Sequence, residues 1–166
     1  MRNRRLRGNM ALETMLWIPI ILMLMVGIEQ LGKITFVYYQ LKKTLDTIGT
    51  YVATQQGIDF CDTTGDTTIQ QAIAFALTGS TDGTASSQFP QLTADQISVG
   101  TECVDASSST ITTCSVSGCD GVGGAQRPDY LVITIPNGYQ VTPHLPYMLV
   151  DPITLKPQVR IPFGGT

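Results

Sequence analysis

MRNRRLRGNMALETMLWIPIILMLMVGIEQLGK, residues 1–33, is the stretch that decides the fold of this 166-residue chain. A leader with four arginines and no acid comes first, and after Glu13 a run from Thr14 to Ile28 carries no charge. Basic residues stay on the cytoplasmic side of a membrane. The stretch therefore predicts one helix crossing the inner (cytoplasmic) membrane over residues 9–32, with its N-terminus in the cytoplasm and everything after Lys33 exported.

The length of the apolar run leaves its exact placement open. Its fifteen residues extend about 22 Å as a helix, which is short of the ~30 Å hydrocarbon core. Counting from Asn9 gives enough length but places Glu13 inside the segment, where an ionised side chain near the centre costs about 2.5–3.5 kcal/mol. A cleaved signal peptide is disfavoured, because residues 24–29 offer no pair of small residues before a cut. An uncleaved signal anchor explains the arginines and the apolar run, but not Glu13.

A helical pattern continues beyond the membrane segment. Apolar residues recur at spacings of three and four, and from Leu31 onward the residues between them are mostly polar, which is typical of a heptad seam. We expect one helix from Asn9 to Gln56, about 70 Å long, with residues 33–56 as its amphipathic extension and a kink or local melting at Pro19. The seam either packs on the chain's own globular domain or on other subunits. Its members are Trp17, Ile20, Leu24, Gly27, Leu31, Ile34, Tyr38, Leu41, Leu45, Ile48 and Val52.

The residues around the first glycine resemble a known class of processing site. Gly8 followed by NMALE looks like the prepilin peptidase site of the Tad (Flp) pilus class, in which the cut follows the glycine and glutamate is fifth in the mature chain. Residues 8–33 are similar to the start of TadE-like proteins, the pilin-like components of the Tad apparatus. Thr14 departs from the pattern, because the family often has phenylalanine or tyrosine there. The matching positions are Glu13, Pro19, Gly27, Gly32 and Lys33.

The resemblance implies a structural protein, a minor pilin or pseudopilin made as a membrane-anchored precursor and cut between Gly8 and Asn9. Its implied partners are a prepilin peptidase, other pilin-like subunits, the Tad inner-membrane assembly components and the lipid bilayer. Assembly at or into a Tad-type pilus would make an extracellular location possible. The alternative is an uncleaved, signal-anchored periplasmic or envelope protein that binds a partner and has no enzymatic activity.

Cleavage would change the charge of the chain and the setting of Glu13. Six basic residues would remain against thirteen acidic ones, a net charge of −7, which argues against nucleic acid as a partner. The new α-amino group of Asn9 would lie one helical turn from Glu13, on the same face. A carboxylate in an apolar setting needs a partner or takes up a proton. The amine of a neighbouring subunit, or its own, would serve, whereas the simpler interpretation is an unpartnered interfacial acid.

The exported residues 57–166 predict one small head, and the fold class of the whole chain is α+β. We expect a helix from Thr67, with Gln70 completing a capping box, to Gly79, followed by a loop. Antiparallel strands follow, and no internal repeat is found. The expected strands are residues 96–104 and 110–116, flanking a turn at Ala106–Ser109, then 129–135, and 155–161 at an edge because Pro157 cannot donate to a central ladder.

Four cysteines lie on the exported side and predict two disulfides that stabilise the head. Cys103 lies three residues before the expected turn and Cys114 five residues after it, and we expect them to face each other across it, which leaves Cys61 with Cys119. The other two pairings stay open. A zinc site is the rival, but CSVSGC lacks the usual C-x-x-C spacing.

Motifs of known enzyme classes are missing. The single histidine, His144, lies in the proline-rich stretch TPHLPYM, and there is no G-x-S-x-G, H-E-x-x-H or P-loop. Asp59, Asp62 and Asp66 lack the alternation of a calcium loop, so we expect solvated acids. The sequence predicts no enzyme, no cofactor and no metal site.

Overall fold

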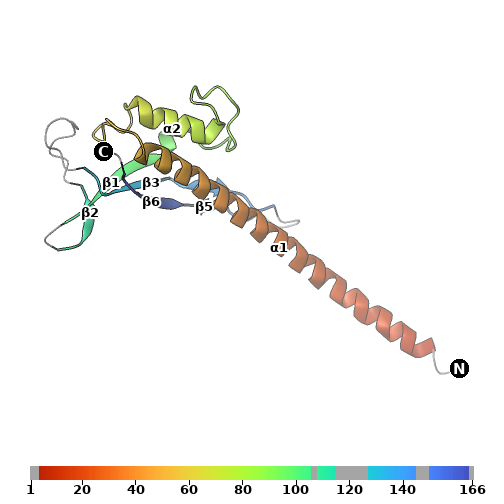
Figure 1. The fold of residues 1–166 in the computed structure, drawn as a ribbon. Coiled ribbons are helices and arrows are strands. Elements are labelled where there is room, and N and C mark those ends of the chain that lie inside the picture. The colour runs from red at the N-terminus through yellow and green to blue at the C-terminus, as the bar shows by residue number, and fades with distance from the viewer. Residues whose placement is uncertain (1–3, 106–107, 115–126, 145–149, 165–166) are drawn as a thin grey trace. The chain divides into compact units, whose positions relative to one another are not determined.

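The computed structural model of the chain has the predicted α+β fold (Figure 1). It describes residues 4–105, 108–114, 127–144 and 150–164, and only the backbone of residues 4–9 and 11. The chain divides into two compact units, a first unit of Met1–Val37 with Val141–Ile153 and a second unit of Tyr38–Gln140 with Thr154–Thr166. The elements are α1 (Arg4–Ala53), α2 (Thr67–Thr78), the 3-10 helix η1 (Ala94–Gln96), β1 (Ser98–Val104), β2 (Ile111–Thr113), β3 (Tyr130–Thr134), β4 (Tyr139–Val141), β5 (Ile153–Leu155) and β6 (Gln158–Pro162).

Helix α1 begins five residues before the predicted start and ends three residues before the predicted end. The leader is helical because arginine and leucine are strong helix formers. At the other end, the N–H groups of Thr54 and Gln55 donate to carbonyls only three residues back, a tightening that commonly closes a helix. Gly57 follows with a φ of 75°. The helix continues through Pro19, so the melting considered for that position does not occur.

The outer part of the heptad seam forms the core of the second unit. Leu41, Leu45, Ile48 and Val52 are all fully buried. A Cβ placed on Gly49 would collide with the side chain of Ile161 and would lie 2.7 Å from Ile133 Cδ1, so α1 packs closely on β3 and β6. For this part of the seam, the structure decides between the two alternatives in favour of packing on the chain's own domain.

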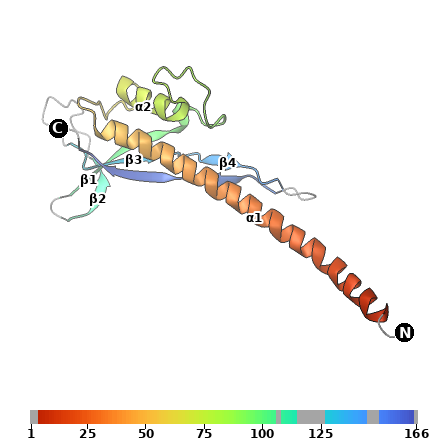
Figure 2. The ribbon, with the colours of Figure 1, turned by 45° about the vertical axis from the view of Figure 1, so that its right-hand side comes forward.

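Helix α2 covers a different side of the same part of α1. The rings of Tyr51 in α1 and Phe75 in α2 lie 6.5 Å apart. In both ribbon views this end of α1 runs between α2 and the larger sheet (Figures 1 and 2). The head is therefore built around one end of α1, which supplies its central element.

The larger sheet is antiparallel with the strand order β2-β1-β3-β6. Leu131 and Ile133 of the central strand β3 are fully buried. Strand β6 lies at an edge, directly after Pro157, which confirms the edge position predicted for that segment. The sequence analysis missed a second sheet, in which β4 pairs with β5.

Helix α2 ends as predicted but is capped differently at its start. The side chain of Asp66 accepts hydrogen bonds from the N–H groups of Thr68 (2.8 Å) and Ile69 (3.0 Å). Asp66 is therefore the N-cap, and the capping box predicted for Thr67 and Gln70 is wrong by one residue. At the other end Gly79 adopts a φ of 77°, and its N–H donates to the carbonyl of Phe75.

Candidate functional site

The predicted processing residues lie in the first turns of α1. The backbone is helical from Arg4, so the bond between Gly8 and Asn9 is part of the helix, while the side chains of these two residues lie outside the described part. Glu13 is exposed, four residues after Asn9 in the same helix. The described side chains provide no ion-pair partner for its carboxylate. The spacing therefore fits the predicted pairing with a new α-amino group, and the structure does not test that pairing.

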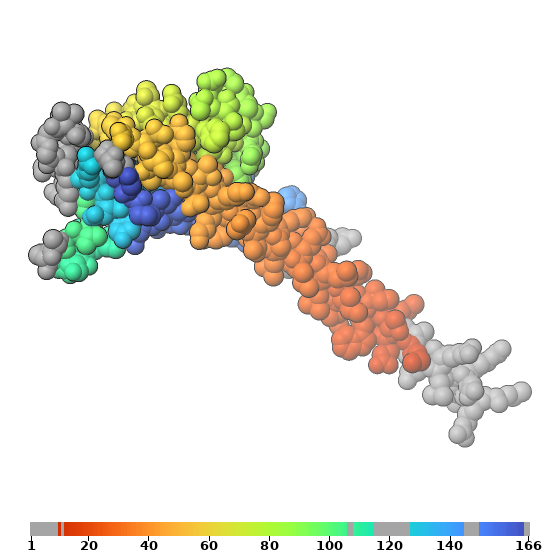
Figure 3. All heavy atoms as spheres, in the orientation of Figure 1, coloured from red at the N-terminus to blue at the C-terminus, as the bar shows by residue number. Residues whose placement is uncertain are grey.

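The part of α1 that follows Glu13 exposes an almost continuous apolar surface. Met15, Leu16, Met23 and Leu24 all have more than 60% of their residue surface exposed, and nothing covers the face of this stretch that is seen in Figure 3. Soluble proteins rarely expose apolar patches of this size without a use. Within the described residues, α1 is the one helix long and apolar enough to cross a membrane. It has the length and composition of a membrane anchor or a signal sequence.

An ion pair follows the uncharged run. Lys33 Nζ lies 2.7 Å from Glu29 Oε1, one helical turn apart, with both side chains largely exposed. These are the first formal charges after Glu13. Because the two charges pair with each other, residues 29–33 of α1 are less polar than their sequence alone suggests.

A second segment of the first unit is fastened to α1 next to this ion pair. The Nε2 of Gln30 donates to the carbonyl of His144 (3.0 Å), and the N–H of His144 donates to Gln30 Oε1 (3.4 Å). These two hydrogen bonds resemble the backbone hydrogen bonds between a pair of strands. Between Gln30–Val37 and Val141–His144 lies a groove of about 330 Å³. Sequence analysis missed the groove, because nothing in the local sequence around Gln30 or His144 indicates that the two segments meet.

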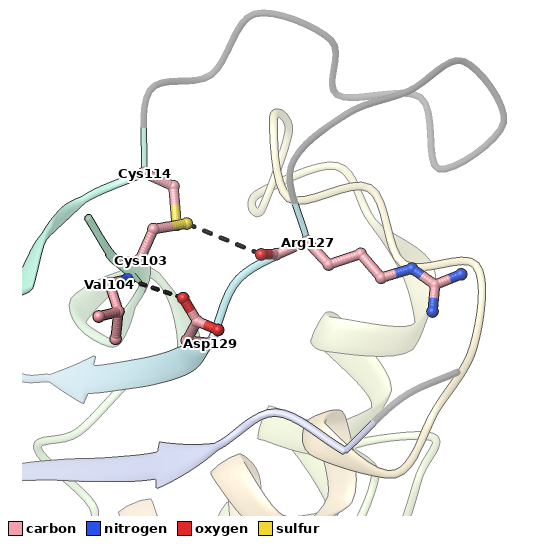
Figure 4. Close-up of a disulfide and its surroundings, with 5 residues drawn as sticks. All are labelled: Cys103, Val104, Cys114, Arg127 and Asp129. Atoms are coloured by element: carbon pink, nitrogen blue, oxygen red, sulfur yellow. Dashed lines mark hydrogen bonds between the residues drawn. A yellow bond between two sulfur atoms is a disulfide. The ribbon is translucent and has the colours of Figure 1, made fainter. Parts of the chain in front are cut away.

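The disulfide between Cys103 and Cys114 confirms one predicted pairing (Figure 4). The two cysteines do not lie directly opposite each other, however, because Cys103 lies opposite Thr112 and the N–H of Cys114 donates to the carbonyl of Thr101. The bridge therefore runs diagonally. An offset of two residues keeps both side chains on the same face of the hairpin.

Two backbone contacts surround this bridge (Figure 4). The Asp129 carboxylate accepts a hydrogen bond of 2.7 Å from the N–H of Val104, which fixes the start of β3 to β1. The Sγ of Cys103 lies 3.7 Å from the Arg127 carbonyl oxygen. Because a bonded sulfur carries no proton, we regard this as a van der Waals contact.

Cys61 is also disulfide-bonded. Its predicted partner, Cys119, lies outside the described residues. The pairing of Cys61 with Cys119 therefore stays a prediction.

The three aspartates after α1 accept local hydrogen bonds, and Asp59 and Asp62 are exposed, as expected for solvated acids. The Asp59 carboxylate accepts from the N–H of Cys61, and Asp66 caps α2. Bonds from the hydroxyl of Thr64 and the N–H of Gly65 lower the pKa of Asp62. Among the described residues, no three His, Cys, Asp or Glu side chains are grouped to hold a metal ion.

Comparison of the chain with protein-family models, with curated proteins and with solved structures gave no match.

Proposed function

We propose that this chain is a structural protein, a TadE-like minor pilin or pseudopilin that is made as a membrane-anchored precursor and assembled at or into a Tad-type pilus. The observation that carries the proposal is the division of α1. The stretch after Glu13 exposes apolar side chains, whereas residues from Leu41 to Val52 form the core of the head. One helix thus serves as a membrane segment and as the spine of an exported domain.

The continuity of α1 bears on where the chain could be cut. No break separates the apolar stretch from the buried seam, so removal of the apolar stretch as a signal peptide would leave the buried residues from Leu41 onward in place but would remove the membrane-spanning part of α1. A cut after Gly8 removes the arginine-rich leader and leaves the buried seam intact. Processing at Gly8 is therefore compatible with a stable mature protein.

The exposed apolar side chains suit the two partners that the proposal requires. Before assembly they face lipid, where an apolar helix is stable. In a filament or pilus base, the same side chains would pack against the helices of other pilin-like subunits. Burial is worth about 1.5–3 kcal/mol for each large apolar side chain, so either setting stabilises this part of α1, whereas water does not.

The alternative, an uncleaved signal-anchored envelope protein, is favoured by one observation. Because α1 begins at Arg4, the Gly8–Asn9 bond is helical and must be unwound before a peptidase can cut it. Opening near the end of a helix costs little free energy, since helix termini fray. The helical geometry therefore weighs only slightly against processing.

Processing provides the first prediction. N-terminal sequencing of the protein from its host should find Asn9 as the first residue, and Gly8→Val should retain the leader and run at a larger size. Gly27→Val is the matched control, because a Cβ at Gly27 meets no other atom within 4 Å; it should be processed normally. A Gly8→Val chain that still starts at Asn9 would refute the proposed site.

A further inference from the structure

The groove of the first unit combines an apolar lining with one cation. Ile34 and Val37 of α1 face Val141 and Pro143 of the second segment across it, and Lys33 lies at its rim. The two hydrogen bonds between Gln30 and His144 join the two segments that form its walls. A cleft of this kind fits a ligand with hydrocarbon at one end and an anion at the other.

The position of the groove relative to the bilayer follows from the length of the membrane segment. A core of ~30 Å corresponds to about twenty helical residues, so a segment that begins after Glu13 ends near Lys33. The uncharged run stops at Ile28, five residues short. Glu29 and Lys33 form an ion pair within this interval, and both side chains are largely exposed, so Lys33 stays accessible to a second anion. The groove, which starts at Gln30, then lies where acyl chains meet headgroups.

We propose that this groove binds a phospholipid of the outer leaflet, with acyl carbons against its apolar side chains and the phosphate at Lys33. An ammonium group has three N–H donors. The one bonded to Glu29 leaves two for phosphate oxygens. Phe36 lines the groove and is itself exposed, so the acyl chains would extend from the groove along exposed apolar side chains of α1. This inference rests on the membrane anchoring that the proposed function requires.

Fluorescence quenching tests how deep the groove lies in the bilayer. It also distinguishes failure of the lipid site from failure of the membrane anchoring. The full chain is placed at one copy per lipid nanodisc, with lipids brominated either deep or shallow in the acyl chain. Trp17 is the single tryptophan, and we expect deep bromine to quench it. In Trp17→Phe/Phe36→Trp, we expect shallow bromine to quench the new indole. An unquenched Trp17 overturns the anchoring, whereas quenching of Trp17 without quenching at position 36 overturns only the lipid site.

Native mass spectrometry of the full chain in detergent tests the groove itself, with phosphatidylglycerol as the probe. We expect one retained lipid on the wild type, and none on Val37→Trp, which fills the groove. Leu31→Trp is the matched control on an exposed part of α1 that does not line the groove, and it should retain the lipid.

A milder variant covers the case in which the filled groove impairs folding. Lys33→Gln should weaken phosphatidylglycerol retention about tenfold, the usual scale for losing a charge-assisted hydrogen bond. Equal retention by wild type and Lys33→Gln would overturn the phosphate contact. A dimer in place of the lipid adduct that forms with the wild type but not with Val37→Trp would show that a second copy of the chain occupies the groove.

Discussion

At the scale of single residues, Gly49 controls how closely α1 approaches the sheet. It is buried, and an added Cβ would meet the side chains of Ile133 and Ile161. Glycine is a poor choice inside a helix by propensity, at a cost of about 1 kcal/mol relative to alanine. Its presence inside the helix, close to the C-terminal end of α1 at Ala53, is therefore explained by packing.

Gly49→Leu has opposite effects on stability through helix propensity and through packing. Leucine improves helix propensity by about 1 kcal/mol, whereas overpacking a core costs about 1–3 kcal/mol. We expect net destabilisation of the head, seen as a lower thermal midpoint by near-ultraviolet circular dichroism of the full chain in detergent. Thr50→Leu, at the exposed neighbouring position, should leave the midpoint nearly unchanged. A Gly49→Leu midpoint at or above that of wild type would show that the contact is loose.

Asp66 holds the start of α2 and part of the preceding turn. Its Oδ1 accepts from two N–H groups of the helix, and its Oδ2 accepts from the N–H of Asp59. Asp66→Ala should lower the free energy of unfolding by about 1 kcal/mol, the usual value of an N-cap. Asp66→Asn keeps an acceptor oxygen and should lose less. Urea unfolding measures both, and equal stability of wild type and Asp66→Ala would contradict the assignment.

At the scale of elements, the hairpin of β1 and β2 depends on its disulfide. Strand β2 has three residues, all exposed, so it buries little surface of its own. The bridge spans a sequence separation of 11, for which the chain-entropy account gives about 3 kcal/mol.

Removing this bridge should therefore be costly. The double variant Cys103→Ser/Cys114→Ser should reduce the free energy of unfolding by about 2–4 kcal/mol, measured by urea titration under oxidising conditions. The double variant leaves no unpaired thiol and leaves Cys61 bonded, which chemical reduction would not. An unchanged unfolding midpoint, or four titratable thiols in the wild-type protein after denaturation, would contradict the stabilising role.

The elements that sequence predicts correctly are those with a strong local pattern. The apolar periodicity of α1 extends over many turns, and β3 has the alternation and aliphatic content of a central strand. Strands β4 and β5 have three residues each and pair with each other across an interval of the chain, so neither carries a pattern of its own. Their existence depends on tertiary contacts, such as the ring contact between Tyr139 and Phe89.

Local prediction also fails where neighbouring residues offer the same chemistry. Asp66 and Thr67 are both good N-caps, and the choice between them depends on the turn that Asp62 builds just before. The pairing of Cys103 with Cys114 is predictable from proximity along the chain, but its register is not. Hairpin register is set by turn geometry, and here Ser109 has a φ of 53°.

At the scale of the whole molecule, one helix meets two environments. The seam runs in phase along α1, yet only its members from Leu41 onward are fully buried by the head, while Trp17 and Leu24 stay exposed. Periodicity alone does not distinguish these environments, because it reports a face and not its partner. Under the proposed function, the exposed members would face lipid or the helices of other subunits.

Glu13 is the residue at which lipid and subunit packing differ most. Insertion needs no acid there, since the arginines and the apolar run suffice. Assembly has a use for one, because a matched amine and carboxylate between helices would fix a register that apolar packing leaves loosely specified. Such a pair would form only after cleavage creates the amine of Asn9, so it would also distinguish mature from immature chains.

Glu13→Ala should therefore leave expression, membrane insertion and cleavage intact, yet reduce incorporation into the pilus complex. Co-purification with other pilus components measures the loss, and sequencing of the N-terminus verifies that processing is unchanged. Glu13→Gln is the matched control for shape: it keeps the hydrogen-bonding capacity but loses the charge, so it should fail nearly as badly if an amine is the partner. A Glu13→Ala chain that co-purifies at the wild-type level and supports normal piliation would identify this glutamate as an interfacial acid and would favour the signal-anchored alternative.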